Sequence, residues 1–322
     1  MEKLFVKYRK LGASDLHIRE EAKLCYRKDG DLYFSEEVVS TKLFDEFCQS
    51  LGILKEEQER DSSYEDSFGH RYRLNFAKGE KGRMLSVRII SEFLPEFPSE
   101  LYIVLKDLFT SKHGLVLVTG STGSGKSTTL RFFLEQYNES YAKKIICLED
   151  PIEFYYQEKK SLFFQREIGR DSESFETAMK AALRQDPDIL LIGEIRDLQS
   201  LYTALSFAES GHLVFSTLHT GNCVETIHKM ISFSSKEKQE EIRQRLSSSL
   251  RWTIAQELVK GKEGGRVPIF ELLKNTKAVA NMISSGREVQ LPSVLESSAS
   301  QGMCSKEQSR ENWIRKGKLE RI

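Results

Sequence analysis

Long apolar runs, paired cysteines and an excess of charge of either sign are all missing from this sequence of 322 residues. The longest unbroken apolar stretches are about five residues, whereas a membrane-spanning helix needs roughly eighteen or more. We therefore expect no integral membrane segment. The N-terminal stretch MEKLFVKYRKLG carries scattered charges and no apolar core, which is not typical of a signal peptide, so we expect a cytoplasmic protein.

The cysteines lie far apart in the sequence, and no two of them form a CxxC pair. This spacing argues against a disulfide scaffold and against a cysteine-rich zinc site. We expect buried, reduced thiols at Cys25, Cys48, Cys147, Cys223 and Cys304.

The charges balance, since the chain has 48 lysine and arginine residues and 48 aspartate and glutamate residues. No net field then favours a polyanion, and we expect no nucleic-acid partner. The length and a hydrophobic fraction of 39% instead predict an ordinary globular chain with about two domains.

The first 90 residues predict a small α+β domain. Residues 23–34 alternate around an Asp-Gly dipeptide, which tolerates the positive φ angles of a type I′ hairpin turn. Residues 71–77 and 84–90 predict a second hairpin. Between the two hairpins, residues 41–52 have the apolar spacing of a helix and end in a glycine.

Two of the six prolines fall within the segment EFLPEFPSE, which interrupts both the helical and the strand pattern. We place a domain linker there, near residues 92 to 99. The predicted boundaries are an N-terminal domain of residues 1–93, a linker of residues 94–99 and a second domain of residues 100–322.

Strands alternate with helices from about residue 100, which predicts a parallel sheet. Four apolar runs, each ending in polar or small residues, are GLVLVTG, KIICL, DILLI and LVFST. Runs of successive apolar positions are typical of strands covered on both faces by helices. Parallel strands would bring all four polar endings to the carboxyl edge of the sheet, where open α/β sheets bind ligands.

The chain becomes helix-rich after about residue 222. Residues 236–246 predict a solvated helix, and a docking surface is the alternative interpretation. We expect a loop at residues 261–265, a strand or short buried run at 267–273, and a terminal amphipathic helix at 306–317.

The segment GSTGSGKS, residues 120–127, matches the phosphate-binding pattern GxxxxGK[ST] and stands between a predicted strand and a predicted helix, as that motif requires. Its glycines let consecutive backbone N–H groups point inward, and the following helix N-terminus favours anions. Lys126 would contact the β and γ phosphates, and the Ser127 hydroxyl would ligate Mg²⁺. We therefore expect ATP or GTP, with Mg²⁺, bound by Gly120, Ser121, Thr122, Gly123, Ser124, Gly125, Lys126, Ser127 and Thr128.

A P-loop enzyme usually has an aspartate at the end of a second apolar strand, where it holds Mg²⁺. Here the corresponding strand, DILLI, is followed by Gly193 and Glu194. The acidic segment LEDPIEF, residues 148–154, is the candidate to complete that side. Lys126 and Glu149 are 23 residues apart, enough for one helix and a crossover to a parallel strand. The alternative is a solvated turn built on the Asp-Pro dipeptide.

The segment HLVFSTLHT begins and ends with a histidine, His212 before the predicted strand and His219 just past its end. A neutral His219 could donate a hydrogen bond to the γ phosphate or to its attacking water. The alternative is a histidine whose ring bonds to the backbone at a strand end.

Taken in order, the runs GLVLVTGSTGSGKSTT, EDPIEF, ALRQDPDILLIGEIRD and AESGHLVFSTLHT resemble the secretion ATPases of type II secretion and type IV pili. The upstream ASDLHIRE and DGDLYF resemble the short N-terminal domain of the pilus retraction (PilT-like) branch, so the resemblance covers nearly the whole chain. It implies a PAS-like N-terminal domain, a RecA-like P-loop ATPase domain and assembly as a homohexamer. It also implies a motor, peripheral to the inner face of the cell membrane, that acts on an inner-membrane pilus or secretion platform protein.

The resemblance also implies roles for the acidic segment. By its position in the motif, Glu153 matches the catalytic glutamate that polarises the attacking water. Glu149 and Asp150 would orient Glu153 or bind the metal through water.

Three further positions match family motifs. Glu194 corresponds to the Walker B glutamate, which acts on Mg²⁺ or its waters. His212 and His219 correspond to the His box pair, and both would contribute to the nucleotide site.

A neighbouring subunit in such rings commonly supplies an arginine, because a cation in trans stabilises the charge of the phosphoryl-transfer transition state. The family places such arginines in its N-terminal stretch. The candidates in this sequence are Arg71, Arg73, Arg88 and Arg184, and ordinary surface ion pairs are the alternative.

One segment departs from the retraction pattern. Retraction ATPases carry a C-terminal motif close to AIRNLIRE, and this chain reads AVANMISSG at residues 278–286, which keeps Asn281 and lacks the arginine and the acid. The sequence therefore favours retraction and leaves open filament assembly, as in the small competence-pilus ATPases. The alternatives from other classes are a small-molecule kinase and an ATP-binding regulatory subunit, and DNA translocation is disfavoured by the balanced charge.

Overall fold

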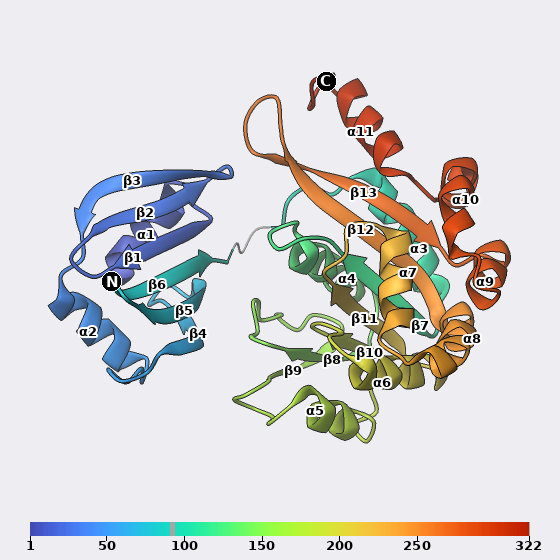
Figure 1. Ribbon diagram of the computed structural model, residues 1–322, viewed down its shortest axis with the longest axis horizontal. Coiled ribbons are helices and arrows are strands. Elements are labelled where there is room, and N and C mark those ends of the chain that lie inside the picture. Colours follow the sequence, from blue (N-terminus) through green and yellow to red (C-terminus); the bar gives the residue numbers. More distant parts are fainter. Residues whose placement is uncertain (91–93, 322) are drawn as a thin grey trace. The chain divides into compact units, whose positions relative to one another are not determined.

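The computed structural model describes residues 1–90 and 94–321, and the chain divides into two compact units (Figure 1). The first unit comprises Met1–Leu94 together with Pro151–Phe154, and the second comprises Pro95–Asp150 and Tyr155–Ile322. Residues 92 and 93 of the predicted linker segment lie outside the described residues. The sequence pattern did not indicate that residues 151–154 group with the first unit.

The described part of the first unit contains a six-stranded antiparallel sheet with the strand order β3-β2-β1-β6-β5-β4. Helices α1 and α2 cover one face of this sheet, because their aromatic side chains share one core with the inward-facing residues of the strands. The elements are α1 (Glu2–Lys10), β1 (Asp15–Arg19), β2 (Lys23–Lys28), β3 (Asp31–Val38), α2 (Thr41–Ser50), β4 (Glu59–Glu65), β5 (Arg71–Gly79) and β6 (Gly82–Ile89).

Both hairpins predicted for the first unit are confirmed. Strands β2 and β3 turn at Asp29 and Gly30, whose φ angles of 52° and 95° are the two positive values that a type I′ turn requires. Strands β5 and β6 form the second hairpin, and α2 is the predicted helix. The α+β character of this unit follows directly from those local patterns.

The second unit is built on a seven-stranded sheet within the described residues, with the order β13-β12-β7-β11-β10-β8-β9. All neighbouring strands are parallel except β12 and β13, which form an antiparallel hairpin. The strands are β7 (Gly114–Thr119), β8 (Lys144–Glu149), β9 (Leu162–Glu167), β10 (Ile189–Ile192), β11 (Leu213–Leu218), β12 (Leu250–Lys260) and β13 (Arg266–Lys274).

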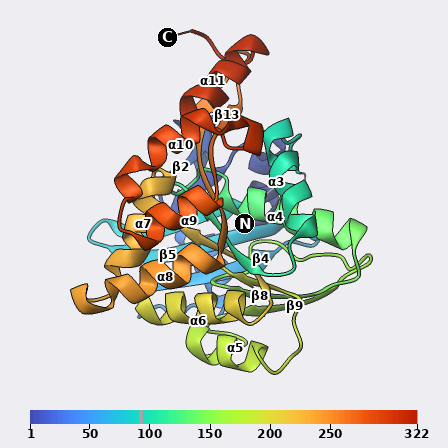
Figure 2. The ribbon, with the colours of Figure 1, turned by 90° about the vertical axis from the view of Figure 1, so that its right-hand side faces the viewer.

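Helices cover both faces of this sheet, which explains the uninterrupted apolar runs of its central strands. Alternate residues of β7, β8, β10 and β11 point into two separate cores, one shared with α3 and α4 and the other with α5 to α8. The course of these helices around the sheet can be followed in Figure 2. The helices are α3 (Ser99–Thr110), α4 (Lys126–Ser140), α5 (Phe175–Ala182), α6 (Leu198–Glu209), α7 (Cys223–Ser232), α8 (Gln239–Ser249), α9 (Lys277–Ser284), α10 (Leu291–Ser297) and α11 (Lys306–Arg315). The mixed α/β fold and the four predicted parallel strands are therefore confirmed.

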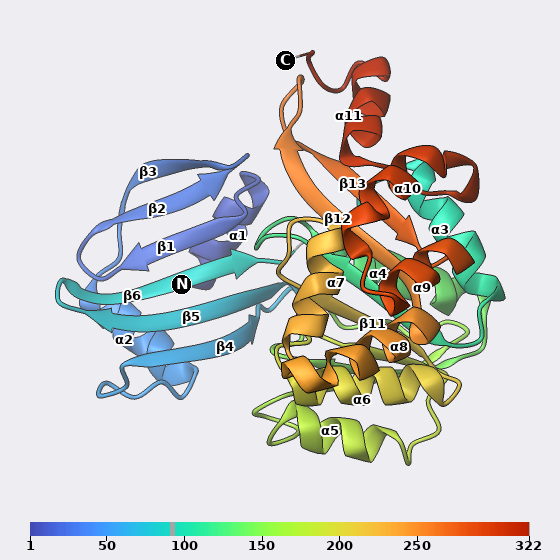
Figure 3. The same cartoon turned by 45° about the vertical axis from the view of Figure 1, so that its right-hand side comes forward.

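Strand β13 agrees with the run expected at residues 267–273, whereas two strands of this sheet, β9 and β12, were not predicted. The region after residue 222 contains the expected helices, but the long hairpin of β12 and β13 interrupts them and extends the sheet beyond β7 (Figure 3). The run RWTIAQELVK mixes apolar and polar residues without a clear strand period, and pairing with β7 decides its conformation. Strand β9 escaped prediction because it is a short edge strand with polar and apolar residues mixed.

Within the described residues all five cysteines are free and buried, as expected. Burial raises the pKa of the Cys147 and Cys223 thiols well above the ordinary value, so both stay protonated and unreactive. Among the helices that the structure describes, none has the length and the hydrophobicity of a membrane span.

Candidate active site

The predicted phosphate-binding loop connects β7 to α4 at the carboxyl edge of the sheet. Gly120 has a φ of 149°, and a Cβ atom there would lie 2.3 Å from the carbonyl oxygen of Gln256 and 2.5 Å from Oγ of Ser124. Gly125, directly before α4, has a φ of 90° in the left-handed region. Glycine is therefore required where the loop leaves β7 and where it enters the helix.

Strand β12 contacts the phosphate-binding loop through Gln256, whose side chain is almost fully buried. The side-chain amide nitrogen of Gln256 donates to the carbonyl oxygen of Ser124 at 2.7 Å. The backbone carbonyl oxygen of Gln256 packs against Gly120. The loop is thus fixed by a strand that follows it by about 130 residues in the sequence. This contact was missed because β12 was not predicted.

We expect the Gln256→Ala variant to lower the free energy of unfolding by about 1–3 kcal/mol, because it leaves the buried carbonyl of Ser124 without its donor and opens a cavity. ATP affinity should fall as well, since the loop loses its support. Denaturant unfolding and equilibrium ATP binding measure the two effects. The matched control is Gln199→Ala on the exposed side of α6, expected to change stability by less than about 0.5 kcal/mol. Wild-type stability and affinity in the Gln256 variant would contradict this role.

Lys126, the first residue of α4, is buried and lies at the centre of the site. Its ammonium group donates to the carbonyl oxygens of Gly120 at 2.8 Å and Ser121 at 3.1 Å. It also lies 3.5 Å from Nδ1 of His219. A cation held by loop carbonyls at a helix N-terminus can exchange those bonds for the oxygens of a phosphate.

His219 connects the lysine to the acidic side of the site. Its Nε2 atom lies 3.7 Å from Oε1 of Glu194. Because the Lys126 ammonium can only donate, Nδ1 accepts, and a neutral ring then carries its proton on Nε2, toward Glu194. The structure therefore brings together Lys126, Glu194 and His219, three of the residues predicted from the sequence.

Arg196 extends this group toward the acidic segment. Its Nε donates to Oε2 of Glu194 at 3.0 Å, and its Nη1 donates to Oδ2 of Asp150 at 3.4 Å. The hydrogen bond to Glu194 raises the pKa of the Arg196 guanidinium. Asp150, directly after β8, and Glu194, after β10, thus share one cation, as expected for neighbouring parallel strands. The sequence carried a signal for this residue in the run GEIRD, where an arginine stands between two acids.

Buried threonine hydroxyls hold the loop after β11 in place. The hydroxyl of Thr226 on α7 has two acceptors within reach, the carbonyl oxygen of Asn222 at 2.7 Å and the hydroxyl oxygen of Thr119 at 3.2 Å, and it lies 2.7 Å from the hydroxyl of Thr220. Thr119 ends β7, and Thr220 follows His219. The histidine is consequently fixed relative to the phosphate-binding loop.

Within one chain, His212 does not lie beside Lys126, His219 and Glu194. It precedes β11, and its Nδ1 lies 3.0 Å from Oγ of Ser210 and 3.2 Å from the carbonyl oxygen of Phe207. His219 follows the other end of the same strand, and six strand residues correspond to roughly 20 Å. The sequence placed both histidines in one motif, but a strand separates them.

Glu153 belongs to the segment that groups with the first unit. There its Oε1 lies 3.9 Å from Nη1 of Arg73, and Arg71 donates to the carbonyl oxygen of Ile152 at 3.4 Å. Arg88 donates to Asp15 at 2.9 Å. Arg184, in the second unit, is exposed to solvent after α5.

The residues of this site fit a nucleoside triphosphate with Mg²⁺. Gly120, where a Cβ atom would clash with Gln256 and Ser124, lets the loop backbone curl, and the buried hydroxyl of Ser124 finds no hydrogen-bond partner within residues 1–90 and 94–321. Those same residues contain no group of three or more His, Cys, Asp or Glu side chains arranged to hold a metal. Mg²⁺ usually binds to one or two protein oxygens together with substrate phosphates and waters, which is what Ser127 and Glu194 can offer.

Comparison with known proteins gives consistent matches over the whole chain. The model of the type II/IV secretion system protein family matches residues 97–315. A type IV pilus retraction ATPase, PilT, of Pseudomonas aeruginosa is 37% identical over 320 residues, which span 97% of this chain and 93% of the relative. A twitching motility protein of Neisseria gonorrhoeae is 39% identical over 267 residues, 82% of this chain and 71% of the relative.

The solved structures agree with the sequence matches. The structure of the pilus retraction motor PilT with bound ADP superposes with a TM-score of 0.85 at 33% identity, and the match covers 99% of this chain and 94% of that one. The similarity therefore includes the N-terminal unit as well as the P-loop unit.

Proposed function

We propose that this chain, which belongs to the type II/IV secretion system protein family, is an ATP-hydrolysing motor that retracts a type IV pilus filament. The observation that carries the chemistry is the series Lys126, His219 and Glu194 at the carboxyl edge of the sheet. The similarity to pilus retraction ATPases over nearly the full length supports the mechanical role, because it extends through both units.

Each residue of the site has a part in the proposed reaction. Hydrolysis breaks the bond between the γ phosphorus and the bridging oxygen, and a water oxygen takes its place to give ADP and inorganic phosphate. Lys126 would stabilise the charge on the β and γ phosphates. His219 would donate its Nε2 proton as a hydrogen bond to the γ phosphate or to the water.

Ser127 and Glu194 are the residues that we propose for Mg²⁺, the serine hydroxyl directly and the carboxylate through water. When bound, Mg²⁺ would neutralise charge on the β and γ phosphates. Glu153 would act as the general base that polarises the attacking water, with Glu149 and Asp150 in supporting positions. The loop residues Gly120 to Thr128 would bind the phosphates through backbone N–H groups and hydroxyls.

We further propose that the motor is a homohexamer whose neighbouring subunit completes each site with an arginine. Arg71, Arg73, Arg88 and Arg184 remain the candidates. In this proposal residues 1–93 and 100–322 act as separate domains joined by residues 94–99. The ring would work in the cytoplasm at the inner face of the cell membrane, against an inner-membrane platform protein.

Steady-state phosphate release by the purified full-length chain tests the proposal in the absence of filaments. We expect continuous hydrolysis of ATP in the presence of Mg²⁺. ATP binding without hydrolysis would instead indicate a regulatory subunit. Transfer of phosphate to a small-molecule acceptor in place of water would indicate a kinase.

Filament assembly is the second candidate function, and one observation favours it. The segment AVANMISSG, which forms α9 and the residues around it, lacks the arginine and the acid of the retraction motif. The two functions require the same ATPase chemistry, so only the direction of filament movement separates them.

A further inference from the structure

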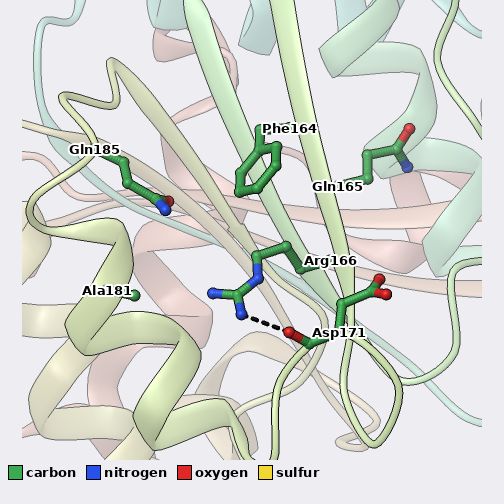
Figure 4. A pocket seen from close by; sticks show the side chains of 6 residues that line it. All are labelled: Phe164, Gln165, Arg166, Asp171, Ala181 and Gln185. Carbon is green, nitrogen blue, oxygen red and sulfur yellow. Dashed lines mark hydrogen bonds between the residues drawn. The ribbon is translucent and has the colours of Figure 1, made fainter.

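Gln165 lies within β9, the edge strand next to β8. Phe164, Gln165 and Arg166 border an open hollow of 690 Å³, and the Gln165 side chain extends to the other side of the strand from Phe164 and Arg166 (Figure 4). This is the alternation that a strand imposes on successive residues. Gln165 lies opposite Cys147, two residues before the carboxyl end of β8, where the acidic segment begins.

The side-chain amide of Gln165 makes two hydrogen bonds to that region. Its oxygen accepts the backbone N–H of Tyr156 at 2.9 Å, and its nitrogen donates to Oε1 of Glu149 at 3.3 Å. The two partners fix the orientation of the amide, since an N–H group requires the oxygen and a carboxylate requires the NH₂ group. Only a side chain with both a donor and an acceptor can make this pair of bonds.

The two partners of Gln165 stand on either side of the acidic loop. Glu149 ends β8, and Tyr156 follows Glu153 by three residues. The Tyr156 ring is partly buried and stacks on Phe163, with ring centroids 4.4 Å apart and planes 8° from parallel. The Tyr156 backbone is thus held by its ring and by Gln165 together, and Gln165 bonds to both ends of the loop.

The second half of the same loop, residues 157–161, is held separately by the P-loop helix α4. Asn138 on α4 is fully buried, donates to the carbonyl oxygen of Gln157 at 2.7 Å and accepts the backbone N–H of Lys159 at 3.0 Å. Residues 157–161 therefore stay in place without Gln165. A change at Gln165 should act on the near half of the loop, which carries the acids.

We propose that Gln165 is a positioning residue for ATP hydrolysis, which holds Glu149 and the acidic loop in the arrangement that water activation requires. This inference rests on the proposed ATPase function and adds a residue outside the recognised motifs. A displacement of about 1 Å in a reacting group can lower turnover about 10²-fold, so two hydrogen bonds are enough to matter.

Two substitutions separate the two bonds. Gln165→Leu removes both, and Gln165→Glu keeps an oxygen for Tyr156 N–H and places a second carboxylate against Glu149. For both variants we expect kcat to fall about 10²-fold and KM for ATP to stay within about twofold of the wild type, since ATP is held by the P-loop. The matched control is Gln157→Glu, which adds the same charge at an exposed position of the same loop.

The pH dependence of kcat supplies a readout that a purely structural role would not change. Two carboxyl groups that share a site raise the pKa of one of them, and the protonated form could donate to Glu149 as the amide does. The kcat of Gln165→Glu relative to the wild type should therefore rise between about pH 8 and about pH 6, whereas that of Gln165→Leu should stay constant. The titratable and charged groups around this position are Glu149 and Cys147 on β8, Glu167 on the same face of β9, and Tyr156 with its neighbours Glu135 and Arg131.

Burial raises the pKa of the Cys147 and Tyr156 side chains well above their ordinary values, so neither titrates in that range. Arg131 stays charged throughout. Gln165→Leu keeps all the other titratable groups and lacks the new carboxyl group. A recovery of kcat at low pH in Gln165→Glu, absent from Gln165→Leu, is therefore assigned to that carboxyl group.

Hydrogen exchange of the peptide that spans residues 149–161 gives a readout that does not need turnover. Gln165→Leu should speed exchange at the Tyr156 amide, and Gln165→Glu should leave it protected. A kcat equal to that of the wild type in both variants would overturn the inference about Gln165, and so would unchanged hydrogen exchange in Gln165→Leu. The proposed ATPase function would still hold, provided that the wild-type chain hydrolyses ATP. If the wild-type chain did not hydrolyse ATP, the proposed function would be contradicted. The positioning role of Gln165 would then be contradicted as well, because it is a role in hydrolysis.

Discussion

The Glu153→Gln variant is expected to bind ATP with wild-type affinity and to lose turnover by about 10²–10⁴-fold, the usual contribution of a general base. Glutamine keeps the size of the side chain and removes the basic oxygen that would take the proton of the attacking water. ATP binding should be unaffected, because the phosphates are held by the P-loop and by Lys126. The variant therefore separates binding from chemistry.

Equilibrium ATP binding and steady-state phosphate release on the same preparation measure the two quantities. The matched control is Glu139→Gln at the end of α4, a glutamate half exposed to solvent that pairs with Lys159 at 2.8 Å. That control should bind and hydrolyse ATP as the wild type does. Turnover of Glu153→Gln close to that of the wild type would remove Glu153 from the chemistry and leave Glu149 and Asp150 as the remaining acids of the segment.

Replacement of Lys126 by alanine should act one step earlier, on binding itself. A hydrogen bond between charged groups contributes about 1.5–3 kcal/mol, so the loss of the ammonium should weaken ATP binding roughly 10- to 100-fold. The substitution also removes the bonds to Gly120 and Ser121 that hold the loop around the lysine. Affinity for ADP should fall less than affinity for ATP, because the γ phosphate is absent.

Isothermal titration with ATP and with ADP measures the Lys126 effect, and thermal unfolding shows whether the fold survives the change. The control is Lys180→Ala on α5, where the exposed lysine pairs with Glu176 on the same helix turn. Equal loss of affinity for ATP and ADP would show that the lysine supports the loop and does not contact the γ phosphate.

The parts of the fold and the site that the sequence predicted depend on local patterns. The P-loop motif fixes its own context, since a glycine-rich turn between a strand and a helix admits few conformations, and Gly120 and Gly125 have the required positive φ angles. The grouping of Lys126, Glu194 and His219 followed from one rule, that parallel strands place their carboxyl ends at one edge.

The residues that escaped prediction act over long separations in the sequence. Gln256 supports the P-loop from β12, and Gln165 contacts the acidic segment from β9, and neither strand was recognised. A glutamine in a mixed polar and apolar run carries no signal of its own, because its role depends on which strand becomes its neighbour. His212 shows the reverse limit, since the sequence correctly placed a strand between the two histidines, and the strand's length keeps His212 away from Lys126 and Glu194 within one chain.

Filament retraction in living cells tests the central claim most directly, with labelled surface filaments followed by microscopy in a strain that lacks the gene. The account predicts an excess of filaments and no retraction events in the deletion strain, restored by the wild-type gene and not by Glu153→Gln. Loss of surface filaments in the deletion strain would contradict retraction and assign this ATPase to filament assembly.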